Sequence, residues 1–172
     1  MTHRKSANFD SSRCFWPAGG GRSTWFARTV FLWLVPAAVL LSTTPAQAAS
    51  CGDTLMGDTV LTADLDCAGN ALMIGAADVT LDCQGHSIMG DGSGHGIMVD
   101  RYMNGVTIRN CGISGFGTGI NLYYVQREHL IEDNVISSVD TGIRFGDSVW
   151  HSTVTRNTIT EVSGSGITMW WS

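Results

Sequence analysis

The sequence predicts an all-β domain of short strands stacked in about five short coils, and three observations support this prediction. Glycine followed by isoleucine recurs every 23 or 24 residues, and a second repeat of the same period is interleaved with the first. No segment has convincing helical periodicity. Residues 49–172 include 18 glycines, which suit tight corners with positive φ.

Residues 1–48 differ in composition from the rest of the chain and predict a secretory signal peptide with a long basic leader. Five basic residues precede an apolar run at residues 29–41, and Ala46 and Ala48 are small residues that a signal peptidase accepts. The run has 13 residues, whereas roughly 20 are needed to cross a bilayer. We therefore expect a secreted protein, extracellular or periplasmic, that begins near Ala49 and has no transmembrane segment after cleavage. An uncleaved membrane anchor is the alternative.

Residues 49–172, the predicted repeat domain, are strongly acidic. They contain 14 acidic residues and five arginines, a net charge of -9. Phosphate groups would be repelled by this charge, so we expect neither nucleic acid nor an anionic membrane as a partner. Polyanionic ligands are disfavoured for the same reason.

The first repeat begins at the Gly-Ile pairs of residues 96–97, 119–120, 142–143 and 166–167. Apolar and polar residues alternate after each pair, as in a half-buried strand. Alignment of the copies predicts two inward-facing columns of core residues. These columns are Ile97, Ile120, Ile143 and Ile167, and then Val99, Leu122, Phe145 and Met169.

The second repeat consists of VTIRN (106–110), LIEDN (130–134) and TVTRN (153–157), with weaker earlier copies at 65–67, 71–75 and 79–83. Its asparagines predict a corner ladder in which amide side chains bond along the stack. The preceding column alternates in charge and predicts a solvated ladder of ion pairs. The asparagines are Asn110, Asn134 and Asn157, and the charged residues are Asp82, Arg109, Asp133 and Arg156.

Several strands in a period of 22 to 25 residues, without a helix, are typical of a right-handed parallel β-helix. The segments DTVLTADLDC and ALMIGAADVTLDCQGHSI and the later VTIRN…GI units resemble secreted right-handed parallel β-helix repeat proteins, with the pectate-lyase-like superfamily fold. The resemblance covers nearly all of residues 49–172. It implies the fold but no single activity, because lyases, hydrolases, epimerases, adhesins and copper-accessory proteins share this fold.

The four cysteines of residues 49–172 predict two disulfides, because their number is even and export leads to an oxidising compartment. Their spacing does not suit a zinc site. The alignment sets Cys83 and Cys111 on adjacent coils, which favours Cys83–Cys111 together with Cys51–Cys67. Cys67–Cys83 together with Cys51–Cys111 is the alternative.

Catalytic candidates are few. Gly94-His95-Gly96 resembles a motif near the active site of some pectin-degrading hydrolases, but residues 70–74 (NALMI) lack the paired aspartates of those enzymes, and residues 49–172 lack lysine. We therefore expect His95 to be a turn residue. Asp91, Asp100 and Arg101 could form an acid, base and cation set, although acids beside glycines are usually turn formers.

Metal sites are also weakly indicated, and we expect no cofactor. The acids are scattered, and sequence neighbours such as Glu132 and Asp133 should point to opposite faces of a strand. Most methionines are expected in the core, and the histidines do not share a column, so a copper-accessory role depends on the resemblance alone. The histidines are His86, His95, His129 and His151.

Exposed aromatic residues are the most suggestive functional feature. Where the Gly-Ile strands leave the core, successive coils present Asp100-Arg101, Tyr123-Tyr124, Gly146-Asp147 and Trp170-Trp171, with Trp150 close by. Aromatic rings beside polar groups can stack on sugars, so we predict Tyr123, Tyr124, Trp150, Trp170 and Trp171 as ligand-binding residues. The alternative for Trp170 and Trp171 is packing against a further coil.

These features favour a secreted, non-catalytic β-helix module that binds glycans or protein partners. A polysaccharide-active enzyme (lyase, hydrolase or epimerase), or a fragment of one, is the first alternative, and a periplasmic copper-accessory protein is the second. The sequence stops at Ser172 in mid-coil, without a polar cap. We therefore expect either a longer solenoid or a polysaccharide or protein partner that covers the last coil.

Overall fold

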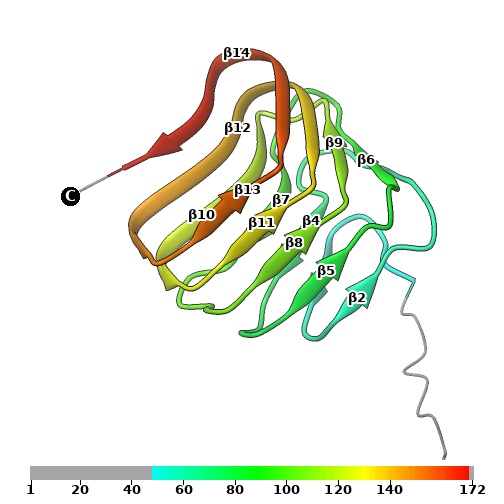
Figure 1. Ribbon diagram of the computed structural model, residues 1–172. Coiled ribbons are helices and arrows are strands. Elements are labelled where there is room, and N and C mark those ends of the chain that lie inside the picture. Colours follow the sequence, from blue (N-terminus) through cyan, green and yellow to red (C-terminus); the bar gives the residue numbers. More distant parts are fainter. Residues whose placement is uncertain (1–47, 171–172) are drawn as a thin grey trace, which may run out of the picture. The chain divides into compact units, whose positions relative to one another are not determined.

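The computed structural model describes residues 48–170, except the side chains of residues 125 and 126, and confirms a parallel β-helix of about five coils (Figure 1). The predicted signal peptide and Trp171 lie outside the described residues. Residues 48–170 contain no helix long and apolar enough to span a membrane. The strands are β1 (Asp53–Leu55), β2 (Thr59–Val60), β3 (Leu65–Asp66), β4 (Leu72–Ile74), β5 (Thr80–Asp82), β6 (Ser87–Met89), β7 (His95–Val99), β8 (Thr107–Arg109), β9 (Gly112–Ser114), β10 (Thr118–Arg127), β11 (Leu130–Glu132), β12 (Val135–Trp150), β13 (Thr153–Thr155) and β14 (Thr158–Met169).

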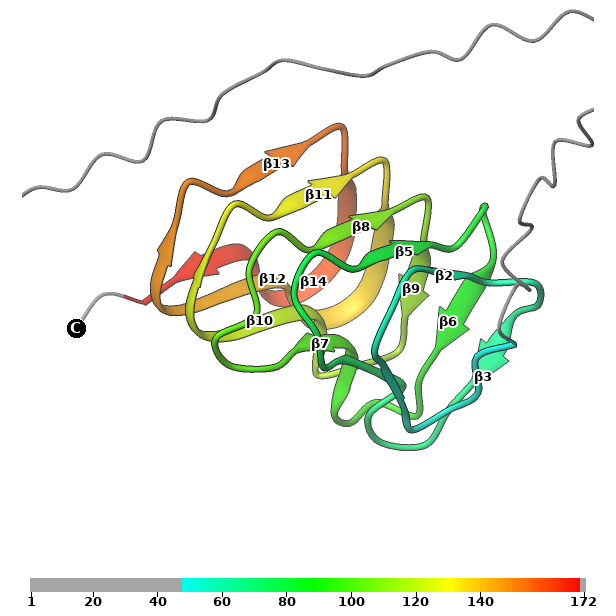
Figure 2. The same ribbon diagram turned by 90° about the horizontal axis from the view of Figure 1, so that it is seen from below.

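Successive strands wind around three faces, and each pairs in parallel with a strand of the next coil. The first face contains β1, β4, β7, β10 and the later parts of β12 and β14. The second contains β2, β5, β8, β11 and β13, which lie side by side in Figure 2. The third contains β3, β6, β9 and the early parts of β12 and β14, so these two long strands bend from the third face to the first.

The two predicted core columns are confirmed by the strand register on the first face. The third face adds an inward column of isoleucines, at residues 88, 113, 136 and 159. Ile167 and Met169 occupy the expected columns but are exposed, because no described coil covers them. The core is therefore a stack of aliphatic layers that ends at the last described coil.

In the first three Gly-Ile pairs, at residues 96, 119 and 142, the glycine is required by close packing between neighbouring coils. A Cβ atom on Gly119 would lie 2.7 Å from both the carbonyl oxygen of Gly142 and a methyl carbon of Ile136. A Cβ atom on Gly142 would lie 2.4 Å from the carbonyl oxygen of Gly166. The glycines therefore recur once per coil, because neighbouring coils approach closely at this corner.

One disulfide closes the first coil, and a second joins the second coil to the third. Cys83 bonds to Cys111 with 4.8 Å between Cα atoms, and Cys51 bonds to Cys67 with 5.5 Å. This is the pairing that the repeat alignment favours. Cys83 and Cys111 are both buried, so their disulfide links neighbouring coils from inside the stack.

The register corrects the predicted asparagine ladder. Glu132 pairs with Arg109, so Asn134 lies one position beyond Asn110, above Cys111. Asn134 and Asn157 do form a ladder, with Asn134 Nδ2 donating to Asn157 Oδ1 at 2.9 Å. Alignment of the repeats by their asparagines places Asn110 and Asn134 in one column. In the structure, the hydrophobic residues before the asparagines set the strand register, and the two asparagines fall one position apart.

Candidate functional site

The predicted aromatic residues lie on the strands of the first face, where these strands bend toward the second. The register sets Tyr123, Gly146 and Trp170 in one column on successive coils. The adjacent column contains Tyr124 and Asp147. Aromatic, glycine and charged residues are thus brought together from β10, from β12 and from the residue that follows β14.

Three of the aromatic side chains are exposed but held by neighbours. Tyr123, Tyr124 and Trp170 expose 50%, 41% and 61% of their surface. The guanidinium carbon of Arg101 lies 5.5 Å from the ring centre of Tyr123, and that of Arg144 lies 5.7 Å from the ring centre of Trp170. Both distances fall within the range of cation–π attraction, so an arginine from the preceding coil orients the rings of Tyr123 and Trp170. The ring of Tyr124 packs edge-on against Tyr102, with 6.4 Å between ring centres.

A pocket of about 300 Å³ lies between these groups. We call it the Tyr123–Trp170 pocket, and its lining residues are Asn121, Tyr123, Tyr124, Arg144, Gly146, Asp147 and Trp170. Arg144 supplies planar N–H donors, Asp147 supplies carboxylate acceptors, and Asn121 supplies an amide. Gly146 adds no side chain, and a Cβ atom there would lie 2.0 Å from the carbonyl oxygen of Tyr123.

One lining residue, Asn121, is part of a buried polar pair. Its Nδ2 donates to Nε2 of His95 at 3.4 Å. Burial, and secondly the positive charge of Arg144, lower the pKa of His95. The neutral ring, with its proton on Nδ1, is the form that accepts this hydrogen bond. His95 is the first residue of β7, so its predicted place in a turn is wrong.

Trp150 does not line the Tyr123–Trp170 pocket. Trp150 is exposed and lines a second pocket, of about 240 Å³, together with Phe145, Met169 and Trp170. This pocket is at the last described coil. The structure therefore brings Tyr123, Tyr124 and Trp170 together, while Trp150 shares a pocket with Trp170 alone among them.

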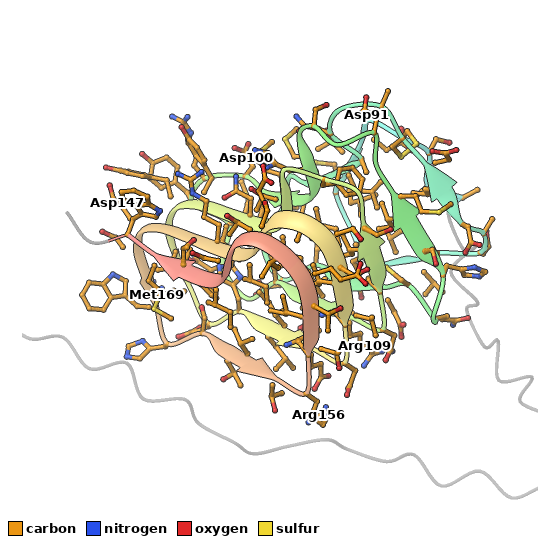
Figure 3. The ribbon with its side chains drawn as sticks, turned by 90° about the horizontal axis from the view of Figure 1, so that it is seen from above. Asp91, Asp100, Arg109, Asp147, Arg156 and Met169 are labelled. Atoms are coloured by element: carbon orange, nitrogen blue, oxygen red, sulfur yellow. A yellow bond between two sulfur atoms is a disulfide. The ribbon has the colours of Figure 1, made fainter. Side chains whose placement is uncertain are left out.

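The acid, base and cation set considered at Asp91, Asp100 and Arg101 is not assembled. Figure 3 shows Asp91 well separated from Asp100. Asp91 Oδ1 accepts hydrogen bonds from the hydroxyl of Ser93 at 2.7 Å and from its backbone N–H at 3.1 Å. These bonds lower the pKa of Asp91 and give it the role of a turn former.

The charged residues at the edge of the second face form ion pairs, on the side of the coils opposite Asp147 (Figure 3). Arg109 Nε lies 3.0 Å from Asp82 Oδ2. Arg156 binds both Glu132, at 2.5 Å, and Asp133, at 2.8 Å. The prediction that these two acids point apart is wrong, because Asp133 has a φ of 55° and turns the chain. The four-residue alternating ladder is therefore two separate clusters.

No three His, Cys, Asp or Glu side chains within residues 48–170 lie close enough to hold a metal ion. The prediction that most methionines belong to the core is wrong. Met169 occupies an inward column but is exposed at the last described coil. All six described methionines are exposed or half-buried: Met56, Met73, Met89, Met98, Met103 and Met169.

The predicted ligand-binding residues omit three polar residues of the pocket. The sequence aligns Asp147 with Tyr124, as the register confirms, but Asp147 is not among the predicted binding residues. Asn121 and Arg144 precede Tyr123 and Gly146 by two residues, which puts them on the same outward side of their strands. The alternation of inward and outward residues along each strand, combined with the alignment of successive coils, could have identified these polar residues.

Comparison with protein families gives one match, to the family described as "Right handed beta helix region", over residues 65–171. Searches of the curated proteins and of the solved structures return no match. The matched segment contains the whole Tyr123–Trp170 pocket.

Proposed function

Because this chain belongs to the right-handed β-helix family, in which stacked coils repeat outward side chains at a fixed spacing, we propose that it is a secreted module that binds glycans in the Tyr123–Trp170 pocket, without catalysis. The observation that carries this proposal is the combination of exposed aromatic rings with Arg144 and Asp147 around one pocket. Aromatic faces give a sugar a flat apolar surface, while the arginine and carboxylate recognise its hydroxyls.

The volume of the pocket supports a small polar ligand rather than a large partner surface. About 300 Å³ is at the lower end of the range for ligand sites. Sugar hydroxyls both donate and accept hydrogen bonds, so one ring can satisfy the guanidinium of Arg144 and the carboxylate of Asp147 together. Two partners of opposite charge also orient the sugar.

The number of carboxylates in the pocket is the reason for proposing binding without catalysis. Glycoside hydrolysis generally requires two carboxyl groups on either side of the bond that breaks. Among the residues described, the pocket lining includes one, Asp147. Secretion is proposed on the basic and apolar leader and on the two disulfides, which persist in oxidising compartments.

Titration of the oxidised protein with neutral and acidic polysaccharides tests this function, by calorimetry and by tryptophan fluorescence. We expect saturable binding that is lost in Tyr123→Ala and kept in Trp150→Ala, since Trp150 lies outside the pocket. Release of reducing sugar ends is measured in the same samples. Failure of every polysaccharide to bind overturns the glycan proposal, and steady release of reducing ends overturns the non-catalytic part.

A further inference from the structure

Two of the three exposed rings of the pocket, those of Tyr123 and Trp170, are separated by a defined distance along the coil stack. Tyr123, Gly146 and Trp170 occupy one column on three successive coils. Adjacent strands lie about 4.8 Å apart, so Tyr123 and Trp170 are attached roughly 9.6 Å apart. Gly146, between them, carries no side chain and lines the pocket.

Charge around this column is balanced. Arg101 and Arg144 face the two rings. Asp100 shares the column of Tyr123, and Asp147 lines the pocket. The formal charges of these four residues cancel, while residues 49–172 as a whole carry -9. A chain of anionic sugars would meet no net positive field here.

Resting on the proposed function, we infer that the ligand is an uncharged, extended β-1,4-linked glycan that runs along the coil stack, with three successive sugars over Tyr123, Gly146 and Trp170. A 1,4-linkage with both bonds equatorial gives an extended chain. Each sugar of such a chain advances by about the length of one ring, which is close to the spacing of adjacent strands. An α-1,4-linked chain curves and leaves the column.

Each of the three positions has a distinct role. The first and third sugars stack on Tyr123 and Trp170, whose outer surfaces are exposed. The middle sugar lies over Gly146, where Arg144 donates to its hydroxyls and Asp147 accepts from them. A disaccharide reaches one ring only, and a trisaccharide is the shortest ligand that reaches both.

Calorimetric titration with oligosaccharides of two, three and four sugars tests the inference. The probes are the cello-, chito- and manno-oligosaccharide series, with malto-oligosaccharides for the α-1,4-linkage and oligogalacturonides for negative charge. In at least one β-1,4 series we expect Kd to fall about tenfold from two sugars to three, because stacking on a second ring adds a favourable contact. A fourth sugar should change Kd by less than about threefold.

Trp170→Ala tests the role of the second ring, with Trp150→Ala as the matched control. We expect Trp170→Ala to remove the gain from the third sugar and to keep the affinity for the disaccharide, while Trp150→Ala leaves the gain unchanged. Equal affinity for two and three sugars in all β-1,4 series, or tighter binding of maltotriose or of oligogalacturonides, overturns this inference while glycan binding itself stands. If no glycan binds, the proposed function fails, and this inference fails with it.

Discussion

The imidazole of His129 accepts a hydrogen bond at Nδ1 from the backbone N–H of Val106, on the preceding coil, at 3.2 Å. His129 is buried between β10 and β11. Its Nε2 is also buried and has no hydrogen-bond partner within residues 48–170. Burial lowers the pKa of His129 to about 4. The ring is therefore neutral in the folded protein at ordinary pH and links two coils.

Acid should destabilise the fold through His129. Its pKa in the folded protein, about 4, lies below the ordinary value of 6.5, so the unfolded chain takes up a proton first as pH falls. The stabilisation is present above pH 6.5 and is lost as pH falls toward 4, by on the order of 3 kcal/mol. Urea unfolding at pH 7 and at pH 4.5 measures this loss.

His129→Gln retains an acceptor for Val106 and removes the titrating ring, so its unfolding free energy should fall less over this pH range. His95, whose pKa is also lowered by burial, contributes equally in both proteins. An equal fall in the unfolding free energy of the wild type and of His129→Gln would rule out His129 as the source of the acid sensitivity.

The buried disulfide Cys83–Cys111 should contribute much of the stability of the early coils. It closes 28 residues of chain, and a loop of that size restricts the unfolded state by about 3.5 kcal/mol. We expect the double variant Cys83→Ala/Cys111→Ala to lose about that amount in denaturant titration. An unchanged midpoint for the double variant would contradict this role. The corresponding Cys51/Cys67 double variant serves as the comparison.

Asn134 should matter more to stability than Asn110, although the two asparagines occupy the same place in the repeat motif. Asn134 is buried, accepts from Cys111 N at 3.0 Å, and donates to Ile108 O at 3.1 Å. Asn134→Ala leaves these groups without partners, and we expect a loss of about 2 to 4 kcal/mol. Thermal and urea unfolding measure it.

Asn110→Gly is the matched control. Asn110 has a φ of 56°, which glycine adopts without strain, and its amide donates to Asp82 near the surface at 3.0 Å. We expect a change within about 1 kcal/mol. Similar losses in Asn110→Gly and Asn134→Ala would contradict the register described here.

Gly146 should resist substitution because β12 passes close to β10 at this point. A Cβ atom on Gly146 would lie 2.0 Å from the carbonyl oxygen of Tyr123, which belongs to the backbone. We expect Gly146→Ala to cost about 1 to 3 kcal/mol, since a strand must shift. Gly166→Ala is the control, because a Cβ atom there meets nothing within 4 Å. A Gly146→Ala protein as stable as Gly166→Ala would show that the approach is looser than described.

The fold could be predicted from the sequence because a solenoid repeats the same local requirements in every coil. Gly119 and Gly142 each stand where the next coil leaves no room for a Cβ atom, and the following isoleucines fill the same core column. Such requirements recur at the coil period, so they are visible without a structure. The disulfide pairing followed from the same alignment.

The aromatic part of the candidate site was also predictable, since Tyr123 and Trp170 follow core strands at equivalent positions. The repeat also aligns Asp147 with Tyr124. A binding role for Asp147 and Arg144 was not predicted, because they come from a coil that contributes no aromatic residue to the pocket. Trp150 was grouped with the others because it is near in sequence to Asp147, yet β12 carries it to a different pocket.

The sequence by itself determined the period, the inward columns and therefore the parallel β-helix, because strand alternation and glycine corners are local properties of each repeat. The tertiary structure alone decided which residues share a coil-to-coil contact. Asn110 differs from Asn134 by a single register step, and a one-residue step changes every side-chain neighbour in a strand. The pocket likewise depends on three strands meeting in register, since its residues are contributed by separate coils.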